Sequence, residues 1–160
     1  MKNKIYVKDK EIIFNDVPRP ILAKFRPIYR IAIIVMILYK CSRNKTASLM
    51  KLSFFNWILK SERNMNAVRM ILYTGILRDA IKINLEPSFK RSLLLAKAEG
   101  FVEIYKSKYR LTDKGIKFGE EIFGNKDIFV LEKKFMKEVK TKIGEDKVEK
   151  FLEMRGSQDD

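Results

Sequence analysis

The chain contains no histidine, a single cysteine and no glycine-rich phosphate loop. Without histidine, the sequence lacks the commonest general base and the commonest zinc ligand. The 7 glycines are scattered along the 160 residues, and no G-x-x-x-x-G-K pattern occurs among them. The spacing of the 20 acidic residues does not indicate a catalytic pair. The sequence therefore predicts a protein without catalytic residues, metal or cofactor, and a carboxylate enzyme is the weakest alternative.

A single cysteine cannot form an internal disulfide, which indicates a reducing compartment. Cys41 lies just after the most apolar run of the chain, residues 31–39. This run is too short for a membrane span, which needs about 20 residues, so it predicts a buried helix. We expect Cys41 to be a core thiol rather than a nucleophile. We also expect a cytoplasmic location and no membrane contact, because no apolar signal-like segment follows the basic first residues.

The net charge of +14 is unevenly distributed. Residues 1–60 contain 13 basic and 3 acidic groups, a net charge of +10. Residues 145–160 contain 3 basic and 6 acidic groups, a net charge of −3. A basic body with an acidic end favours binding to phosphate or to an acidic protein surface. The alternative is that the charge only keeps the protein soluble.

The first half of the chain is predicted to consist of two short strands followed by helices. The strands lie in residues 4–14 with a turn at Asp9-Lys10, and a proline-containing connector follows. Pro27 suits the first turn of a helix that runs to about Ser42. After a polar turn at residues 43–45, either Thr46 or Ser48 can cap the next helix. A further helix is expected over residues 66–78, followed by a strand at 80–85.

The second half is predicted to contain a helix, a hairpin and three more helices. The first helix begins at Pro87 and ends at Gly100. Strands at 101–105 and 109–112 enclose a turn at 106–108, and a helix capped at Thr112-Asp113 continues to about Phe123. A lysine-rich helix over residues 127–143 has an apolar stripe formed by Ile128, Leu131, Phe135, Val139 and Ile143. A last short helix carries Val148, Phe151 and Leu152 before the end of the chain.

Residues 88–115 carry the most informative pattern. A leucine-rich helix is followed by Gly-Phe-Val at 100–102, a hairpin, and Tyr-Arg-Leu-Thr-x-x-Gly at 109–115. This pattern resembles the recognition helix and wing of winged helix-turn-helix proteins, in the form seen in MarR-like families. Winged helices bind DNA, RNA and proteins, so the resemblance implies a fold more than a function. One departure is an additional helix and strand at residues 62–86, and we expect residues 81–85 to be the third strand of the wing sheet.

A longer stretch, residues 26–115, is similar to the small middle component of the ABC three-component systems of bacteria, which include the Lamassu-type antiphage systems. The similarity lies in Arg26-Pro27, in LMKLSFFNWILKS at 49–61, in NLEP at 84–87 and in AEGFV at 98–102. It covers more than half of the chain through diffuse apolar motifs. The resemblance implies a non-enzymatic subunit that assembles with an SMC-like ABC ATPase and a nuclease-like effector.

The predicted recognition helix has a mixed outer face. At about 100° per residue, Phe89, Leu93 and Ala96 share one side, which should face the core. The other side carries the basic residues Lys90, Arg91 and Lys97 together with Leu94 and Leu95. Leucines are unusual on a helix that reads bases in a major groove. They favour contact with a protein partner, unless the helix is buried on both sides within its own fold.

Three cations lie at or near the predicted wing tip: Lys106, Lys108 and Arg110. Wing-tip cations commonly contact phosphates, which positions a duplex without specifying its sequence. Exposed turn lysines also often have no binding role. We therefore expect any DNA contact to be non-specific.

Together these patterns predict a mostly α fold with a small β-sheet, organised as a winged helix-turn-helix with a helical C-terminal extension. The expected parts are strands and connector at 1–25, the winged helix with its inserted helix at 26–124, C-terminal helices at 125–155, and a disordered tail at 156–160. The expected function is an accessory subunit of an SMC-like ABC ATPase antiphage defence complex, which provides protein contacts and non-specific DNA contact. The alternative is a dimeric MarR-like transcription regulator.

Overall fold

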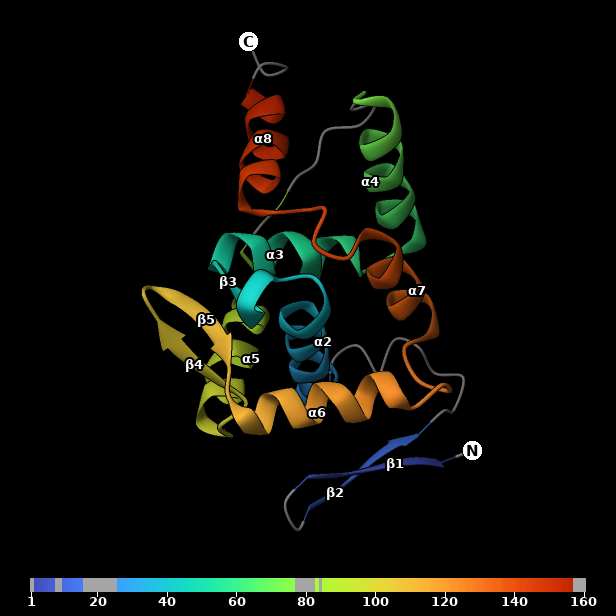
Figure 1. Cartoon of the computed structure of the whole chain (residues 1–160), viewed down its shortest axis with the longest axis vertical. Helices are drawn as coiled ribbons and strands as arrows, with labels where there is room; N and C mark the ends of the chain where they lie inside the picture. The colour runs from blue at the N-terminus through green and yellow to red at the C-terminus, as the bar shows by residue number, and fades with distance from the viewer. Residues whose placement is uncertain (1, 8–9, 16–25, 77–82, 84, 157–160) are drawn as a thin grey trace.

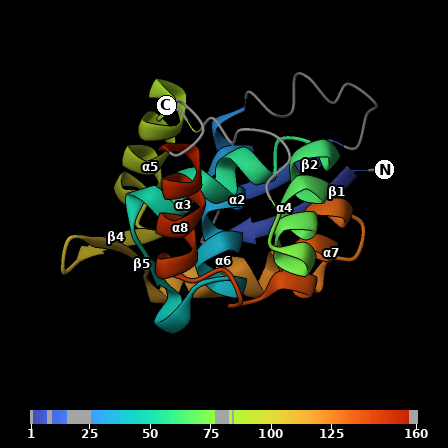
Figure 2. The same ribbon diagram turned by 90° about the horizontal axis from the view of Figure 1, so that it is seen from above.

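The computed structural model describes residues 2–7, 10–15, 26–76, 83 and 85–156, and side chains from residue 26 to 153 within these ranges. It confirms a mostly helical protein with a small sheet (Figures 1 and 2). The predicted connector at 16–25 and most of the predicted tail lie outside the described residues. No helix in the described part of the chain is both long and apolar enough to cross a membrane.

The predicted N-terminal strands form an antiparallel hairpin. It consists of β1 (Lys2–Val7) and β2 (Lys10–Asn15), and Ile5 is paired with Ile12. The hairpin lies along α6 (Asp113–Gly124), which β1 contacts (Figure 1). Residues 8–9 of the turn lie outside the described residues.

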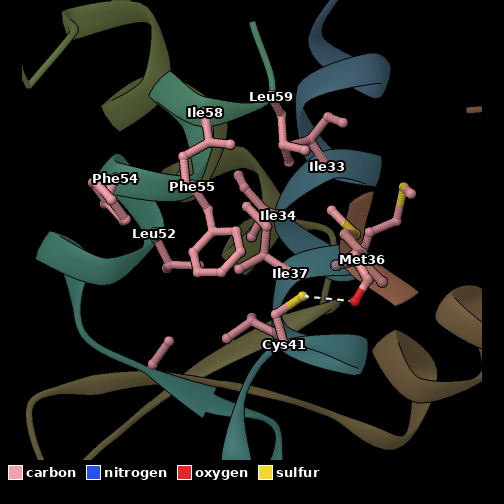
Figure 3. Close-up of a cluster of buried hydrophobic side chains, with 14 of the residues drawn as sticks. Ile33, Ile34, Met36, Ile37, Cys41, Leu52, Phe54, Phe55, Ile58 and Leu59 are labelled. Carbon is pink, nitrogen blue, oxygen red and sulfur yellow. Dashed lines mark hydrogen bonds between the residues drawn. The ribbon is translucent and has the colours of Figure 1, made fainter. Parts of the chain in front are cut away.

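The central helix is α2 (Pro27–Lys40), which has Pro27 at its first position as predicted. All eight residues from Ile31 to Leu38 are buried. The helix can be apolar on every side because α3, α5, α6 and α7 all contact it. Figure 3 shows its isoleucines packed against α3 (Leu49–Ile58), and the prediction of an enclosed helix is confirmed.

The turn after α2 contains a structure that the sequence reading missed. A 3₁₀ turn, η1 (Arg43–Lys45), leads into the short strand β3 (Thr46–Ala47). Ser48 then caps α3, since its hydroxyl accepts a hydrogen bond from the amide of Lys51 at 3.1 Å. Of the two caps considered, Ser48 is therefore correct and Thr46 belongs to the sheet.

The inserted helix α4 (Glu62–Thr74) begins and ends four residues earlier than predicted. It begins there because the Ser61 hydroxyl accepts a hydrogen bond from the amide of Asn64, at 3.2 Å. It ends there because Gly75 adopts a left-handed conformation with φ of 71°. Met65, Val68 and Ile71 form its buried side.

The sheet is formed by three antiparallel strands in the order β3-β5-β4. After α5 (Pro87–Ala98) come β4 (Val102–Tyr105) and β5 (Lys108–Leu111), close to the predicted ranges. Among the described residues the third strand is β3 rather than the expected 81–85, because β3 pairs with the other edge of β5, with Thr46 opposite Arg110. Ile83 and Leu85 have no strand structure, and residues 81, 82 and 84 lie outside the described residues.

A network of short contacts at the start of α6 explains the Thr-x-x-Gly pattern. The Thr112 hydroxyl accepts a hydrogen bond from the amide of Gly115 at 3.1 Å and donates one to the carbonyl oxygen of Gly100 at 2.5 Å. Gly100 has a φ of 80°, which ends the segment after α5 in a left-handed turn. The same threonine thus caps α6 and holds it against the start of the hairpin.

The predicted long helix at 127–143 is wrong in its length. Its helical part is α7 (Val130–Val139), because Phe129 before it and Lys140 after it have positive φ values of 50° and 46°. The flanking Ile128 and Ile143 are still buried, whereas Leu131 of the predicted stripe is half exposed. Apolar spacing predicted most of the buried side but not the two breaks in the backbone.

The last helix, α8 (Glu145–Gly156), lies on α3. The ring centroids of Phe151 and Phe54 are 5.5 Å apart, and Val148 of the same helix is also buried. Residues of α7 and α8 belong to the same hydrophobic cluster as residues of α2 and α3. Gly156 is the last residue of this helix, so it is not part of the predicted disordered tail.

Candidate functional site

Helix α5 is held in place by ion pairs at its start and by the packing of one apolar side. Glu86, just before the helix, forms ion pairs with Arg30 of α2 and with Lys60, which follows α3. These three residues line a cavity of about 440 Å³ between α2, α3 and the start of α5. On the inner side of α5, the predicted core residues Phe89, Leu93 and Ala96 are all buried. The position of α5 therefore determines which of its side chains face outward.

The outer side of α5 carries every residue that the sequence reading selected there. Lys90, Arg91 and Lys97 are exposed. Leu94 is 68% exposed and Leu95 is 37% exposed. These values exclude burial of α5 on both sides. The helix thus presents two leucines within a basic surface.

The hairpin of β4 and β5 projects from the body of the protein (Figure 1). Its turn consists of Lys106 and Ser107, which both adopt left-handed conformations, with φ values of 49° and 62°. Two consecutive residues of this kind are typical of the tight turns that join antiparallel strands. Lys106 and Lys108 are exposed at this tip, where phosphate contact was predicted.

Arg110 differs from the two lysines because side chains of the neighbouring strand β4 already contact it. Its Nε and Nη2 atoms lie 2.9 and 2.6 Å from Oε1 of Glu103, its partner in the β4–β5 register. Its guanidinium also lies 3.8 Å from the ring centre of Tyr105. Ile104 and Tyr105, which the sequence reading did not select, are 48% and 40% exposed. The outer edge of the hairpin is therefore partly apolar and aromatic.

A second polar cluster lies where α8 meets the start of α3. One carboxylate oxygen of Glu145 accepts a hydrogen bond from the Ser48 amide at 2.9 Å, and the other accepts one from the Ser48 hydroxyl at 2.6 Å. Lys51 is 3% exposed, and its ammonium donates to the carbonyl oxygen of Cys41 at 2.8 Å. Burial lowers the pKa of Lys51, and the nearby charge of Glu145 opposes that shift. No sequence motif marked this cluster, since its residues come from distant segments.

Cys41 lies in the core, as predicted. Its side chain is fully buried next to α3 residues such as Leu52, and its thiol points to the carbonyl oxygen of Met136 at 3.8 Å (Figure 3). Burial raises the pKa of the thiol to about 12. A thiol with this pKa is almost entirely protonated near neutral pH, which makes it a poor nucleophile.

Within the described residues, no group of three or more His, Cys, Asp or Glu side chains is arranged to hold a metal ion. No protein-family model, curated protein or solved structure matches the chain.

Proposed function

We propose that this chain is a winged-helix subunit that binds a protein partner and performs no chemistry itself. The order of α2, β3, α3, α5, β4 and β5 supports the winged helix, because that fold places a short strand after its first helix and a hairpin after its third. The sheet order β3-β5-β4 fits the same arrangement. In this reading α5 is the recognition helix, β4 and β5 form the wing, and α4 is an insertion.

The exposure of Leu94 and Leu95 is the observation that carries the proposal. A helix that reads a major groove presents polar and basic side chains to the base edges. Here the corresponding side of α5 presents a leucine that is 68% exposed beside a second leucine. Large contiguous apolar patches on monomeric proteins commonly mark interaction sites, whereas single exposed apolar residues are ordinary. A protein surface is therefore a better partner for this helix than a specific DNA sequence.

The surroundings of the two leucines indicate the chemistry of the partner. Lys90, Arg91 and Lys97 surround them on the exposed side of α5. A complementary surface would present an apolar patch with an acidic rim. Because Leu94 is 68% and Leu95 is 37% exposed, their burial removes about as much surface as one fully exposed leucine, which contributes roughly 1.5 to 3 kcal/mol before the costs of association.

The identity of the assembly follows from the resemblance of residues 26–115 to the middle components of Lamassu-type systems. On that basis the partner is an SMC-like ABC ATPase, and a nuclease-like effector completes a cytoplasmic antiphage complex. Non-specific DNA contact is a second part of the proposal. The exposed Lys106 and Lys108 at the wing tip and the net charge of +14 support it.

The test is a pull-down from cells that express the tagged chain, in which the wild type and a Leu94→Asp/Leu95→Asp variant are compared for copurification of an SMC-like ATPase. We expect loss of the complex with an unchanged thermal melt, because both side chains lie outside the core. The matched control is Val130→Asp/Leu131→Asp, which changes two half-exposed apolar residues on α7. The control should still copurify.

Three results would contradict the proposal. Copurification of the α5 variant would place the interface elsewhere, and a collapsed melt would mean that the leucines stabilise the fold. A footprint of a dimer on a palindromic sequence would instead favour the MarR-like regulator, because a two-fold symmetric dimer binds two related half-sites.

A further inference from the structure

The inserted helix α4 is firmly attached along one side. Its buried side consists of Met65, Val68 and Ile71. Arg69 attaches the helix to α7, because its Nε and Nη2 atoms both lie 2.9 Å from Oε2 of Glu138. The helix is therefore fixed to the body of the protein, although the winged-helix pattern does not require it.

The other side of α4 exposes apolar surface where the helix ends. Tyr73 is 79% exposed, the highest value among the large apolar side chains of the described residues, and Met70 is 40% exposed. These two residues are three positions apart, which makes them neighbours on a helix surface. Ile76 follows the left-handed Gly75, a place where an apolar residue usually packs back on the helix, yet it is 59% exposed. We call Met70, Tyr73 and Ile76 the α4 end.

The surroundings of the α4 end are neutral in a strongly basic chain. Residues 70–76 contain no charged side chain. The helix α8 projects toward the same end of the molecule (Figures 1 and 2). The helix α4 contains 1 acidic and 2 basic residues and α8 contains 4 and 3, so their combined net charge is 0. Because a high net charge keeps proteins apart, two chains of charge +14 can approach most easily where the charge is balanced.

The two exposed apolar surfaces of the protein therefore favour different partners. The leucines of α5 lie among the exposed cations Lys90, Arg91 and Lys97. A two-fold contact through α5 would bring the cations of both copies together, which costs free energy. No such repulsion arises at the α4 end. The α4 end thus fits a second copy of this chain, whereas α5 fits an acidic partner.

The size of a stable interface indicates that α8 belongs to the contact. Each partner usually buries about 800 Å², which is more than three side chains supply. The exposed side of α8 carries acidic and basic residues in alternation along the helix: Asp146, Lys147, Glu149, Lys150 and Glu153. A helix surface with both signs of charge can pair with its own copy in the antiparallel direction, since each acid then meets a base.

We propose that this chain forms a two-fold symmetric dimer through the α4 end and the exposed side of α8. Tyr73 lies beside the two-fold axis and packs on the second copy's Tyr73. In this dimer the inserted helix serves self-association and leaves α5 and the wing accessible. The inference goes beyond the proposed function and is independent of the leucine surface on α5.

The first test is sedimentation velocity of the full chain from micromolar to near-millimolar concentration. The wild type should change from monomer to dimer over this range. Tyr73→Glu/Ile76→Glu should weaken self-association at least about tenfold, because each copy would bury two carboxylates without partners. The matched control is Val130→Glu/Leu131→Glu, which adds the same charge at two exposed apolar residues of α7. The control should associate like the wild type.

Salt and the α5 variant provide two further readouts. Added salt should strengthen the dimer, because it screens the repulsion between two basic chains and leaves an apolar contact intact. A contact between a basic and an acidic surface would instead weaken. Leu94→Asp/Leu95→Asp should dimerise like the wild type, so that failure of this proposal is distinguishable from failure of the proposed function.

A cysteine placed at the axis tests the geometry directly. The natural Cys41 is buried, so Tyr73→Cys and Val130→Cys each introduce a single exposed thiol. A disulfide requires the two Cα atoms to lie within about 7 Å of each other. Under mild oxidation, Tyr73→Cys should therefore form a covalent dimer much faster than Val130→Cys, which reports random collisions.

Several outcomes would overturn the proposal. These are a wild type that stays monomeric at all concentrations, a dimer that survives Tyr73→Glu/Ile76→Glu or weakens with salt, and equal rates of crosslinking for the two cysteine variants. Loss of the dimer in Leu94→Asp/Leu95→Asp would place the second copy on α5 instead. If Tyr73→Glu/Ile76→Glu lowers the melting temperature, the cysteine variants provide the decision.

Discussion

Gly115 lies directly against the carbonyl oxygen of Phe101. A Cβ atom at position 115 would lie 2.1 Å from that oxygen and 2.9 Å from a side-chain methyl of Leu111. Phe101 directly precedes β4, and its carbonyl oxygen accepts a hydrogen bond from the amide of Thr112 at 3.1 Å, so it cannot move away without disturbing the hairpin. Glycine at this position therefore sets how closely α6 approaches the wing.

The first prediction is that Gly115→Ala destabilises the protein by about 3 kcal/mol, the upper end of the usual cost of overpacking, because the added methyl group would meet backbone rather than a flexible side chain. The control is Gly124→Ala at the end of the same helix, where an added Cβ would meet nothing within 4 Å. That change should be neutral or stabilise by up to about 1 kcal/mol, because alanine favours helix. Urea unfolding of both variants measures the difference. Equal stabilities would mean that α6 can shift to accept the methyl group.

The second prediction separates the two wing lysines from Arg110. Lys106→Asn with Lys108→Gln should weaken binding to all duplexes alike and reduce the salt slope by up to about 1.8, or 0.9 per contact. Asparagine is used because position 106 has a positive φ, which asparagine tolerates. Gel shifts at several salt concentrations measure both effects.

For Arg110→Gln we expect a smaller loss of affinity, because this side chain is paired with Glu103 and stacked on Tyr105. The main effect should be a decrease in stability of at most about 1 kcal/mol, as for other partly exposed pairs. A loss of affinity as large as that of the double lysine variant would show that Arg110 leaves Glu103 to contact phosphate.

The third prediction concerns Cys41. Its pKa is raised from 9 to about 12 by burial, so the folded thiol should resist labelling by a disulfide reagent at pH 8 and react fully in urea. Above pH 9 the thiol ionises in the unfolded chain but not in the folded one. Its contribution to stability is therefore present below pH 9 and lost as the pH rises towards 12. Rapid labelling of the native protein at pH 8 would show that the core opens at this site.

Local patterns predicted the helices and the faces they bury with good accuracy. Pro27 and Pro87 begin helices as expected, and Phe89, Leu93 and Ala96 turn inward. These features depend on the spacing of apolar residues and prolines within one segment, and that spacing can be read directly from the sequence. The exposure of Leu94 and Leu95 followed from the same spacing.

The predictions from sequence were wrong where contacts with distant segments of the chain affect the backbone conformation. The helix expected at 127–143 is interrupted at Phe129 and Lys140. The ring of Tyr29 lies 5.1 Å from that of Phe129, and its hydroxyl donates to Glu132 at 3.1 Å. These contacts between α2 and α7 thus lie where α7 begins. Apolar spacing within one segment gives no information about contacts with another helix.

The amino-acid sequence by itself determined that the protein is mostly helical, that one helix is enclosed on all sides, and that two leucines face away from the core. Only the tertiary structure decided that Thr46–Ala47 completes the sheet, and that Glu145 reaches Ser48. A two-residue strand is too short to produce a periodic signal, and a contact across 97 residues depends on how the helices pack. Segment-level patterns determine which side of each element is buried, whereas the partners of individual polar groups are determined by packing.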